Sequence, residues 1–326
     1  MRKWEATKVM KRALHALALY RYHIMTHLAI GIVMLWLLWT CILRYRVFGT
    51  SVDMAIYTQF CWLLSRGEVM TEATFYRSYN GPQHPSNPLA VHMALVLLPI
   101  SVVYKLFPSP VTLITIQVLA VWFSVLGLWR LSQVRLRDSL IASLLSIGFA
   151  LYPPMYFQAR NDFHTDVFTM LAIIWLWVGI VEDKRWLFWS CLIGALSARE
   201  SAAVPLLVLG MMLLLRRDER RFGAIILMAS GIWFVLCNGL LLPWLRAGRP
   251  HVAMPRAYGY LGESLGKILI SAVMNPSQVA RYLISTDTWL TAIQLLAPML
   301  FLPLLCPRFA IPAFTVFAMV FASRYA

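Results

Sequence analysis

The chain alternates between long apolar runs and short polar stretches that are mostly basic. The apolar segments are residues 24–43, 93–107, 111–129, 139–157, 165–181, 186–198, 201–215, 222–243, 288–305 and 309–323. Most of them reach or approach the length of about 17–25 residues that an α-helix needs to cross a bilayer. The pattern therefore predicts an all-α integral membrane protein.

The segment 93–107 decides how the chain is threaded through the membrane. It contains Pro99 and Lys105 and is followed by Pro108 and Pro110. If it does not cross, every basic cluster faces one side, which the Lys and Arg content of short loops assigns to the cytoplasm. These clusters are the N-terminus, Arg130/Arg135/Arg137, Lys184/Arg185, Arg216/Arg217/Arg220/Arg221 and Arg308. We therefore predict a re-entrant or interfacial helix over 93–107 and about nine spans. The N-terminus is then cytoplasmic, and two outer loops cover about 44–110 and 244–287.

Residues 1–22 form a basic N-terminal segment of their own. Trp4, Met10, Leu14 and Leu17 recur in it at near-helical spacing. We expect an amphipathic helix on the cytoplasmic membrane surface, followed by one transmembrane domain over 23–326. The alternative is a plain charged tail.

Composition narrows the class of protein further. The chain is 60% hydrophobic and 13% charged, which excludes an ordinary soluble enzyme and a disordered protein. Its net charge of +15 could suggest nucleic acid. Basic residues also set membrane topology and meet anionic lipids, so we expect membrane lipids and no nucleic acid as partners. The five cysteines are scattered without a C-x-x-C pair, which argues against a thiolate metal site.

The predicted topology collects a set of ionisable residues at the outer face. Such groups are costly near hydrocarbon and usually have a partner or a function. The set is Asp53, His84, His92, Asp162, His164, Asp166, Arg199 and Glu200. Its joint appearance on one side predicts a site there.

Asp162 and Asp166 are four residues apart, so they share a helix face if a helix has begun by that point. Two like charges on one face need a compensating cation, which Arg160, Arg199 or a divalent metal could supply. Asp162, His164 and Asp166 would suit Mg²⁺ or Mn²⁺, because these ions prefer such ligands. The alternatives are that Asp162 caps a helix and that Arg199 and Glu200 form a structural ion pair.

The sequence lacks the motifs of several well-known enzyme classes. The chain has no G-x-x-x-x-G-K-[ST], no H-E-x-x-H and no G-x-S-x-G sequence. Nucleotide hydrolysis, zinc proteolysis and serine hydrolysis are therefore not indicated.

Several short motifs lie at the predicted outer face: Asp53 to Gln59, His92, the stretch 105–110, the run 162–166 and residues 199–201. Together they resemble the motifs of the domain-of-unknown-function 2079 family of prokaryotic membrane proteins, which are similar to GT-C membrane glycosyltransferases. In that family the first motif is an Asp followed by a Phe-Asp-Gln-like end, where this chain has Thr58 in place of an acid. The run 162–166 resembles Asp-Phe-His-Pro-Glu with two replacements, and 199–201 resembles Lys-Glu-Asp without its last acid.

The resemblance implies a GT-C-like fold in a prokaryotic cytoplasmic membrane, with juxtamembrane helices in the outer first loop. GT-C enzymes move a sugar from a polyprenyl-phosphate carrier, and some need a divalent metal. By analogy, Asp53 is the base for the acceptor hydroxyl, and Arg160 or Arg199 holds the carrier phosphate. We therefore expect catalytic roles for Asp53, Glu200 and Asp162, and substrate binding by Gln59, His92, Arg160, His164 and Arg199.

Two other functions remain open at this point. The replaced acids and the basic N-terminal segment would also suit a non-catalytic membrane subunit that keeps the fold and packs into a larger complex. A transporter or flippase is less favoured, because transporters favour internal repeats and midplane charges, whereas these acids lie at an interface.

Overall fold

The computed structural model describes residues 2–249, 257–305 and 307–323, and the described part is helical without a strand. It divides into two compact units. Unit 1 comprises Met1–Met54 and Pro110–Leu192, and unit 2 comprises Ala55–Ser109 and Ile193–Ala326. Each unit is described by itself below. The expected all-α class is confirmed.

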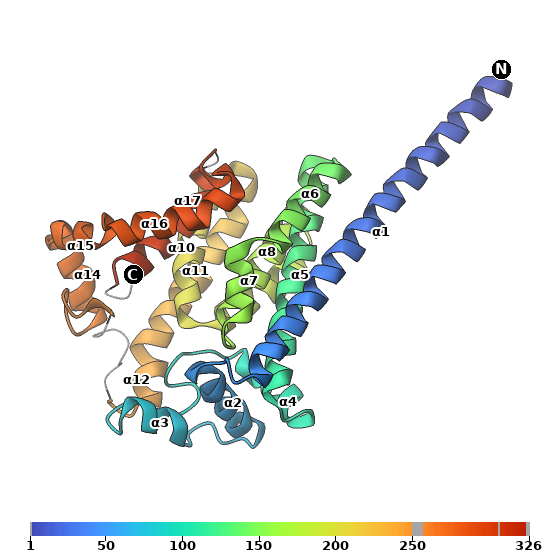
Figure 1. The fold of residues 1–326 in the computed structure, drawn as a ribbon. Helices are drawn as coiled ribbons and strands as arrows, with labels where there is room; N and C mark the ends of the chain where they lie inside the picture. Colours follow the sequence, from blue (N-terminus) through green and yellow to red (C-terminus); the bar gives the residue numbers. More distant parts are fainter. Residues whose placement is uncertain (1, 250–256, 306, 324–326) are drawn as a thin grey trace. The chain divides into compact units, whose positions relative to one another are not determined.

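Unit 1 is built around the long helix α1, whose continuous course Figure 1 shows in blue. One stripe of α1, Ile30, Met34, Leu37 and Cys41, is buried because its spacing of three or four residues places it on one face. α5 contacts α8, α6 and α1, and α1 also contacts α6 and α7. The helices are α1 (Arg2–Arg46), α5 (Pro110–Leu136), α6 (Ser139–Ala150), α7 (Pro153–Arg160) and α8 (Asp166–Val181).

Unit 2 centres on the closely packed pair α10 and α11. A methyl group at Gly210 would lie 2.7 Å from the backbone nitrogen of Leu227, and one at Gly223 would lie 2.6 Å from that of Leu214. The two backbones therefore approach as only glycine allows. The helices are α3 (Thr74–Asn80), α4 (Leu97–Leu106), α10 (Ala203–Leu214), α11 (Arg220–Leu236), α12 (Leu242–Leu245), α14 (Leu265–Met274), α15 (Pro276–Leu283), α16 (Thr286–Leu296) and α17 (Pro307–Phe321). α2 (Val52–Ser65) and α9 (Arg185–Ala198) each run from one unit into the other.

Three helices of the described residues are long and apolar enough to cross a membrane, and a bent pair makes up to four. The three are Arg21–Arg46, Pro110–Leu136 and Arg217–Leu245; the pair is Ser139–Ala150 with Pro153–Arg160, bent by 44°. Shorter apolar helices cover Leu97–Leu106, Asp166–Val181, Glu200–Leu214 and Ala310–Phe321. By length and composition these helices fit an α-helical membrane protein, while nine spans stay a prediction.

In two segments the structure differs from what the sequence pattern predicted. Segment 288–305 is not one helix, because α16 ends at Leu296 and the backbone of Leu300 and Phe301 has positive φ. Pro298 and Pro303 cannot donate the hydrogen bonds that a continuous helix needs there. The predicted outer loop 244–287 also contains two helices, α14 and α15.

For the predicted N-terminal amphipathic helix, the structure describes the backbone of residues 2–20 but not their side chains. The backbone from Arg2 to Tyr22 is helical and continuous with the first candidate span. The side chains of residues 1–20 lie outside those described, so the amphipathic surface helix stays a prediction.

Candidate functional site

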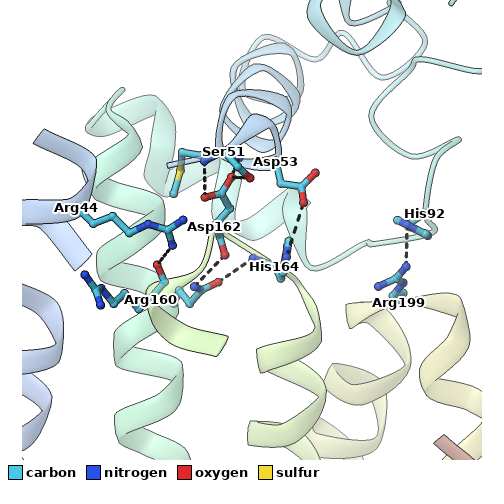
Figure 2. A network of polar contacts seen from close by, with 10 residues as sticks. Arg44, Ser51, Asp53, His92, Arg160, Asp162, His164 and Arg199 are labelled. Atoms are coloured by element: carbon cyan, nitrogen blue, oxygen red, sulfur yellow. Dashed lines mark hydrogen bonds and ion pairs between the residues drawn. The ribbon is translucent and has the colours of Figure 1, made fainter. Parts of the chain in front are cut away.

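In unit 1, the short connection between α7 and α8 is organised by Asp162. Its buried carboxylate accepts hydrogen bonds from the Ser51 backbone N–H (2.9 Å), the Ser51 hydroxyl (2.7 Å) and the Met54 backbone N–H (2.9 Å) (Figure 2). These donors stand at the N-terminus of α2, where a negative charge is favourable. Asp162 therefore caps a helix, but one that begins 110 residues before it.

The buried side chain of Gln117, on α5, also forms hydrogen bonds to this connection. Its amide nitrogen donates to the carbonyl oxygens of Ala159 (3.0 Å) and Asp162 (3.3 Å). Its amide oxygen accepts the backbone N–H of His164 at 2.8 Å. One side chain thus fixes both ends of the turn that presents His164.

Asp53 and His164 are the two predicted site residues that this scaffold brings together. Asp53 lies in the first turn of α2, and 46% of its side chain is exposed. His164 Nε2 lies 3.8 Å from Asp53 Oδ2 (Figure 2). A carboxylate that is open on one side and next to an imidazole can accept a proton from a bound hydroxyl group.

Arg160 ends α7 beside the last turn of α1. Its carbonyl oxygen accepts a hydrogen bond from Arg44 Nη1 at 2.5 Å (Figure 2). Arg44 Nε also donates to the carbonyl oxygen of Gly49 at 2.6 Å. The Arg160 guanidinium lies 5.8 Å from the centre of the Tyr156 ring. The structure therefore places a second arginine, Arg44, next to the predicted one.

In unit 2, His92, Arg199 and Glu200 form a second cluster. His92 Nδ1 lies 2.9 Å from Glu200 Oε1, and Arg199 Nη2 lies 2.9 Å from His92 Nε2 (Figure 2 shows the latter contact). Arg199 can only donate, so a neutral His92 accepts at Nε2 and donates from Nδ1 to Glu200, and a protonated His92 still donates from Nδ1 to Glu200. The Met93 N–H donates to Glu200 Oε2 at 2.9 Å, which attaches the segment before α4 to this cluster.

The charge of Glu200 is stabilised by these contacts. Burial opposes ionisation, but the charge of a protonated His92 and its hydrogen bond, the positive charge of Arg199 and a backbone hydrogen bond together lower the pKa of Glu200 to about 2. The arrangement resembles the structural ion pair considered from the sequence, with a histidine placed between the two charges.

Gln59 has a structural role in unit 2. Its amide oxygen accepts the Phe75 backbone N–H (3.0 Å), and its amide nitrogen donates to the Thr74 hydroxyl (2.8 Å). Both partners stand at the start of α3, so Gln59 fixes that helix. Its predicted part in substrate binding gains no support from this geometry.

The predicted metal ligands are not arranged for a metal. α7 ends at Arg160 and α8 begins at Asp166, so Asp162 and Asp166 do not share a helix face. Both carboxylate oxygens of Asp162 are occupied by donors. Among the described residues, no three or more His, Cys, Asp or Glu side chains form a group that could hold a metal. Asp162, His164 and Asp166 therefore do not fit Mg²⁺ or Mn²⁺ in this arrangement.

Several residues of these clusters were missed from the sequence: Arg44, Ser51, Gln117 and Met93 through its N–H. Gln117 gave one signal, since an amide within the apolar run 111–129 must find hydrogen-bond partners when buried. Ser51 and Met93 act through contacts more than a hundred residues away, which no local pattern indicates.

The apolar helices, with polar clusters near their ends, define an α-helical membrane protein. Residues 44–326 match the family model DUF2079, described as a predicted membrane protein, and the chain belongs to this family. No curated protein and no solved structure matches the chain. As a membrane protein it contacts lipids.

Proposed function

We propose that the protein is a GT-C-like glycosyltransferase that takes a sugar from a polyprenyl-phosphate carrier at the outer membrane face. The observation that supports this most is the Asp53–His164 pair of unit 1, a half-exposed carboxylate beside an imidazole on a turn fixed by Asp162 and Gln117. The proposal includes nine spans, a prokaryotic cytoplasmic membrane and a cytoplasmic N-terminus, in agreement with the distribution of basic clusters.

In this proposal, Asp53 accepts the proton of the acceptor hydroxyl as the hydroxyl oxygen attacks the anomeric carbon of the sugar. The new glycosidic C–O bond forms while the C–O bond to the carrier phosphate breaks, and the electron pair leaves with the phosphate. Arg160 compensates the charge on the leaving phosphate. His164 orients the Asp53 carboxylate, and its Nε2 takes up the proton that Asp53 has accepted and passes it to water.

The remaining predicted residues take different parts. Asp162 positions the start of α2 and does not touch the substrate. Arg199 of unit 2 stays the alternative to Arg160 as the residue that holds the carrier phosphate. The predicted catalytic role of Glu200 is not used in this proposal, because its carboxylate already contacts His92 and the Met93 N–H. Gln59 is left out of the proposal.

The first test uses the protein purified from its native membrane in mild detergent. Mass spectrometry of everything that co-purifies should reveal a polyprenyl phosphate or its glycosylated form. Stoichiometric protein partners without such a lipid would instead favour the non-catalytic subunit.

The second test is a matched pair of variants in membranes that contain radiolabelled lipid-linked sugars. Asp53→Asn should reduce transfer at least about hundredfold, because a general base contributes roughly 10²–10⁴-fold to the rate. Glu68→Gln is the control, since Glu68 is an acid of the same predicted outer loop that pairs with Arg66. Transfer by Asp53→Asn at the wild-type rate would contradict the proposal.

A further inference from the structure

An open cavity of about 600 Å³ lies in unit 1, where the end of α1 meets α7. Its lining combines two arginines, two amides and two apolar side chains. These residues are Arg44, Arg160, Gln158, Asn161, Pro154 and Phe157. Among the described residues that line the cavity there is no carboxylate, so hydrogen-bond donors outnumber acceptors.

The two arginines are held in place by backbone carbonyl oxygens and by an aromatic ring. Arg44 donates to the carbonyl oxygens of Gly49 and Arg160, and the Arg160 guanidinium lies over Tyr156. Within the described residues, neither arginine forms an ion pair with a carboxylate. The neighbouring acid, Asp162, has both oxygens engaged at the start of α2. Two cations at one cavity are most stable when an anion lies between them.

The cavity also lies where a lipid headgroup is expected, at the end of a candidate membrane span and next to aromatic side chains. Arg44 belongs to the last turn of the candidate span Arg21–Arg46. Two turns earlier on α1, Trp36 stacks on Tyr156 of α7 at 5.2 Å and is half-exposed. Phe157 is 64% exposed beside the cavity. An aromatic surface thus continues from the polar cavity toward the apolar part of the span, as expected where a lipid chain follows its headgroup.

We propose that this cavity binds the phosphate of a membrane lipid, with Arg44 and Arg160 facing the phosphate oxygens. Guanidinium groups bind phosphate through paired, charge-assisted hydrogen bonds, and the amides of Gln158 and Asn161 add neutral donors. The inference rests on the proposed function in that Arg160 is the residue assigned there to the carrier phosphate. Binding can be measured without any transfer reaction, so the two proposals can fail separately.

The experiment is native mass spectrometry of the full chain in neutral detergent, titrated with dioleoyl phosphatidylglycerol. Arg160→Gln should weaken binding about tenfold or more, because a hydrogen bond to a charged group is lost. Arg46→Gln is the control, because Arg46 lies in the same last turn of α1 and does not line the cavity. Arg44→Gln should act like Arg160→Gln but also loses two bonds to carbonyl oxygens, so Arg160→Gln decides the question if that variant does not fold.

Two further probes distinguish the source of the phosphate. Inorganic phosphate that binds as tightly as the lipid, with the same dependence on Arg160, would identify a site for free phosphate. Phosphatidylglycerol bound much more tightly than inorganic phosphate would identify a lipid headgroup site. Equal losses in Arg46→Gln and Arg160→Gln, or equal binding of dioleoylglycerol, which has no phosphate, would overturn the proposal. Asp53→Asn should bind the lipid like the wild type, whatever its effect on transfer.

Discussion

At the scale of single residues, Asp162 shows how a predicted site residue can act indirectly. It is buried and accepts three hydrogen bonds, two of them from backbone N–H groups at the start of α2. Its charge therefore serves the helix that presents Asp53. The motif 162–166 places His164 next to Asp53, whereas its first acid, Asp162, anchors the start of α2; a functional site there stays a prediction.

Replacing Asp162 should destabilise unit 1. Asp162→Ala leaves two backbone donors and the Ser51 hydroxyl without their acceptor, at a cost of about 2–4 kcal/mol. Thermal unfolding in detergent should show the loss as a lower midpoint. Asp53→Ala is the comparison, because Asp53 is about half-exposed and should change stability little. Equal effects of the two substitutions would contradict the role assigned to Asp162.

Glu200 gives a prediction about pH. Its folded pKa of about 2 lies below the ordinary value of 4.5, so its ionised form stabilises the fold. This contribution is complete above about pH 4.5 and is lost as the pH falls toward 2. The groups that act on it are His92, Arg199 and Arg246. Thermal unfolding measured between pH 6 and 3 should show a steeper loss of stability in the wild type than in Glu200→Gln. Parallel curves for the two proteins would rule out this contribution.

At the scale of elements, the pair α10 and α11 depends on the absence of side chains at their contact. Gly210→Ala or Gly223→Ala would place a methyl group under 3 Å from backbone atoms of the other helix, and backbone cannot move aside as a side chain can. We expect a loss of about 1–3 kcal/mol from either substitution. Gly231→Ala on α11 is the control, since its nearest neighbour would be the Leu207 side chain at 3.7 Å. Unfolding midpoints of the three variants make the comparison, and similar midpoints would refute the argument.

The elements also show where the sequence pattern is sufficient. Hydrophobic runs located the candidate spans Arg21–Arg46 of α1 and Pro110–Leu136 of α5 closely, because a helix in lipid must be apolar over its whole length. The pattern did not reveal the bend between α6 and α7 or the break after Leu296, since both depend on prolines inside an apolar run. Asp53 and His164 could be predicted because both adjoin apolar runs on one predicted side. Gln117 and Ser51 could not, because their roles depend on contacts that form only in the folded chain.

At the scale of the whole molecule, the predicted topology can be checked directly. Glu68→Cys should react with a membrane-impermeant maleimide added outside intact cells. Asp183→Cys should react only after the membrane is opened, because its loop contains Lys184 and Arg185 and is predicted to be cytoplasmic. Both variants are made in a chain whose own cysteines are replaced. Labelling of Asp183→Cys in intact cells would show that the chain has the opposite orientation and that the predicted outer site faces the cytoplasm.

The bonds from Asp162 to Ser51 and Met54 have a consequence for the biogenesis of the protein. The two partners are separated by 111 and 108 residues of chain. A ribosome delivers α1 and the start of α2 to the membrane well before it has made the α7–α8 connection. During that interval the Asp162 carboxylate, which anchors the start of α2, has not yet been made. Asp53 therefore reaches its final position only late in synthesis. A nascent chain arrested before residue 162 would have inserted its first span without an assembled Asp53–His164 pair.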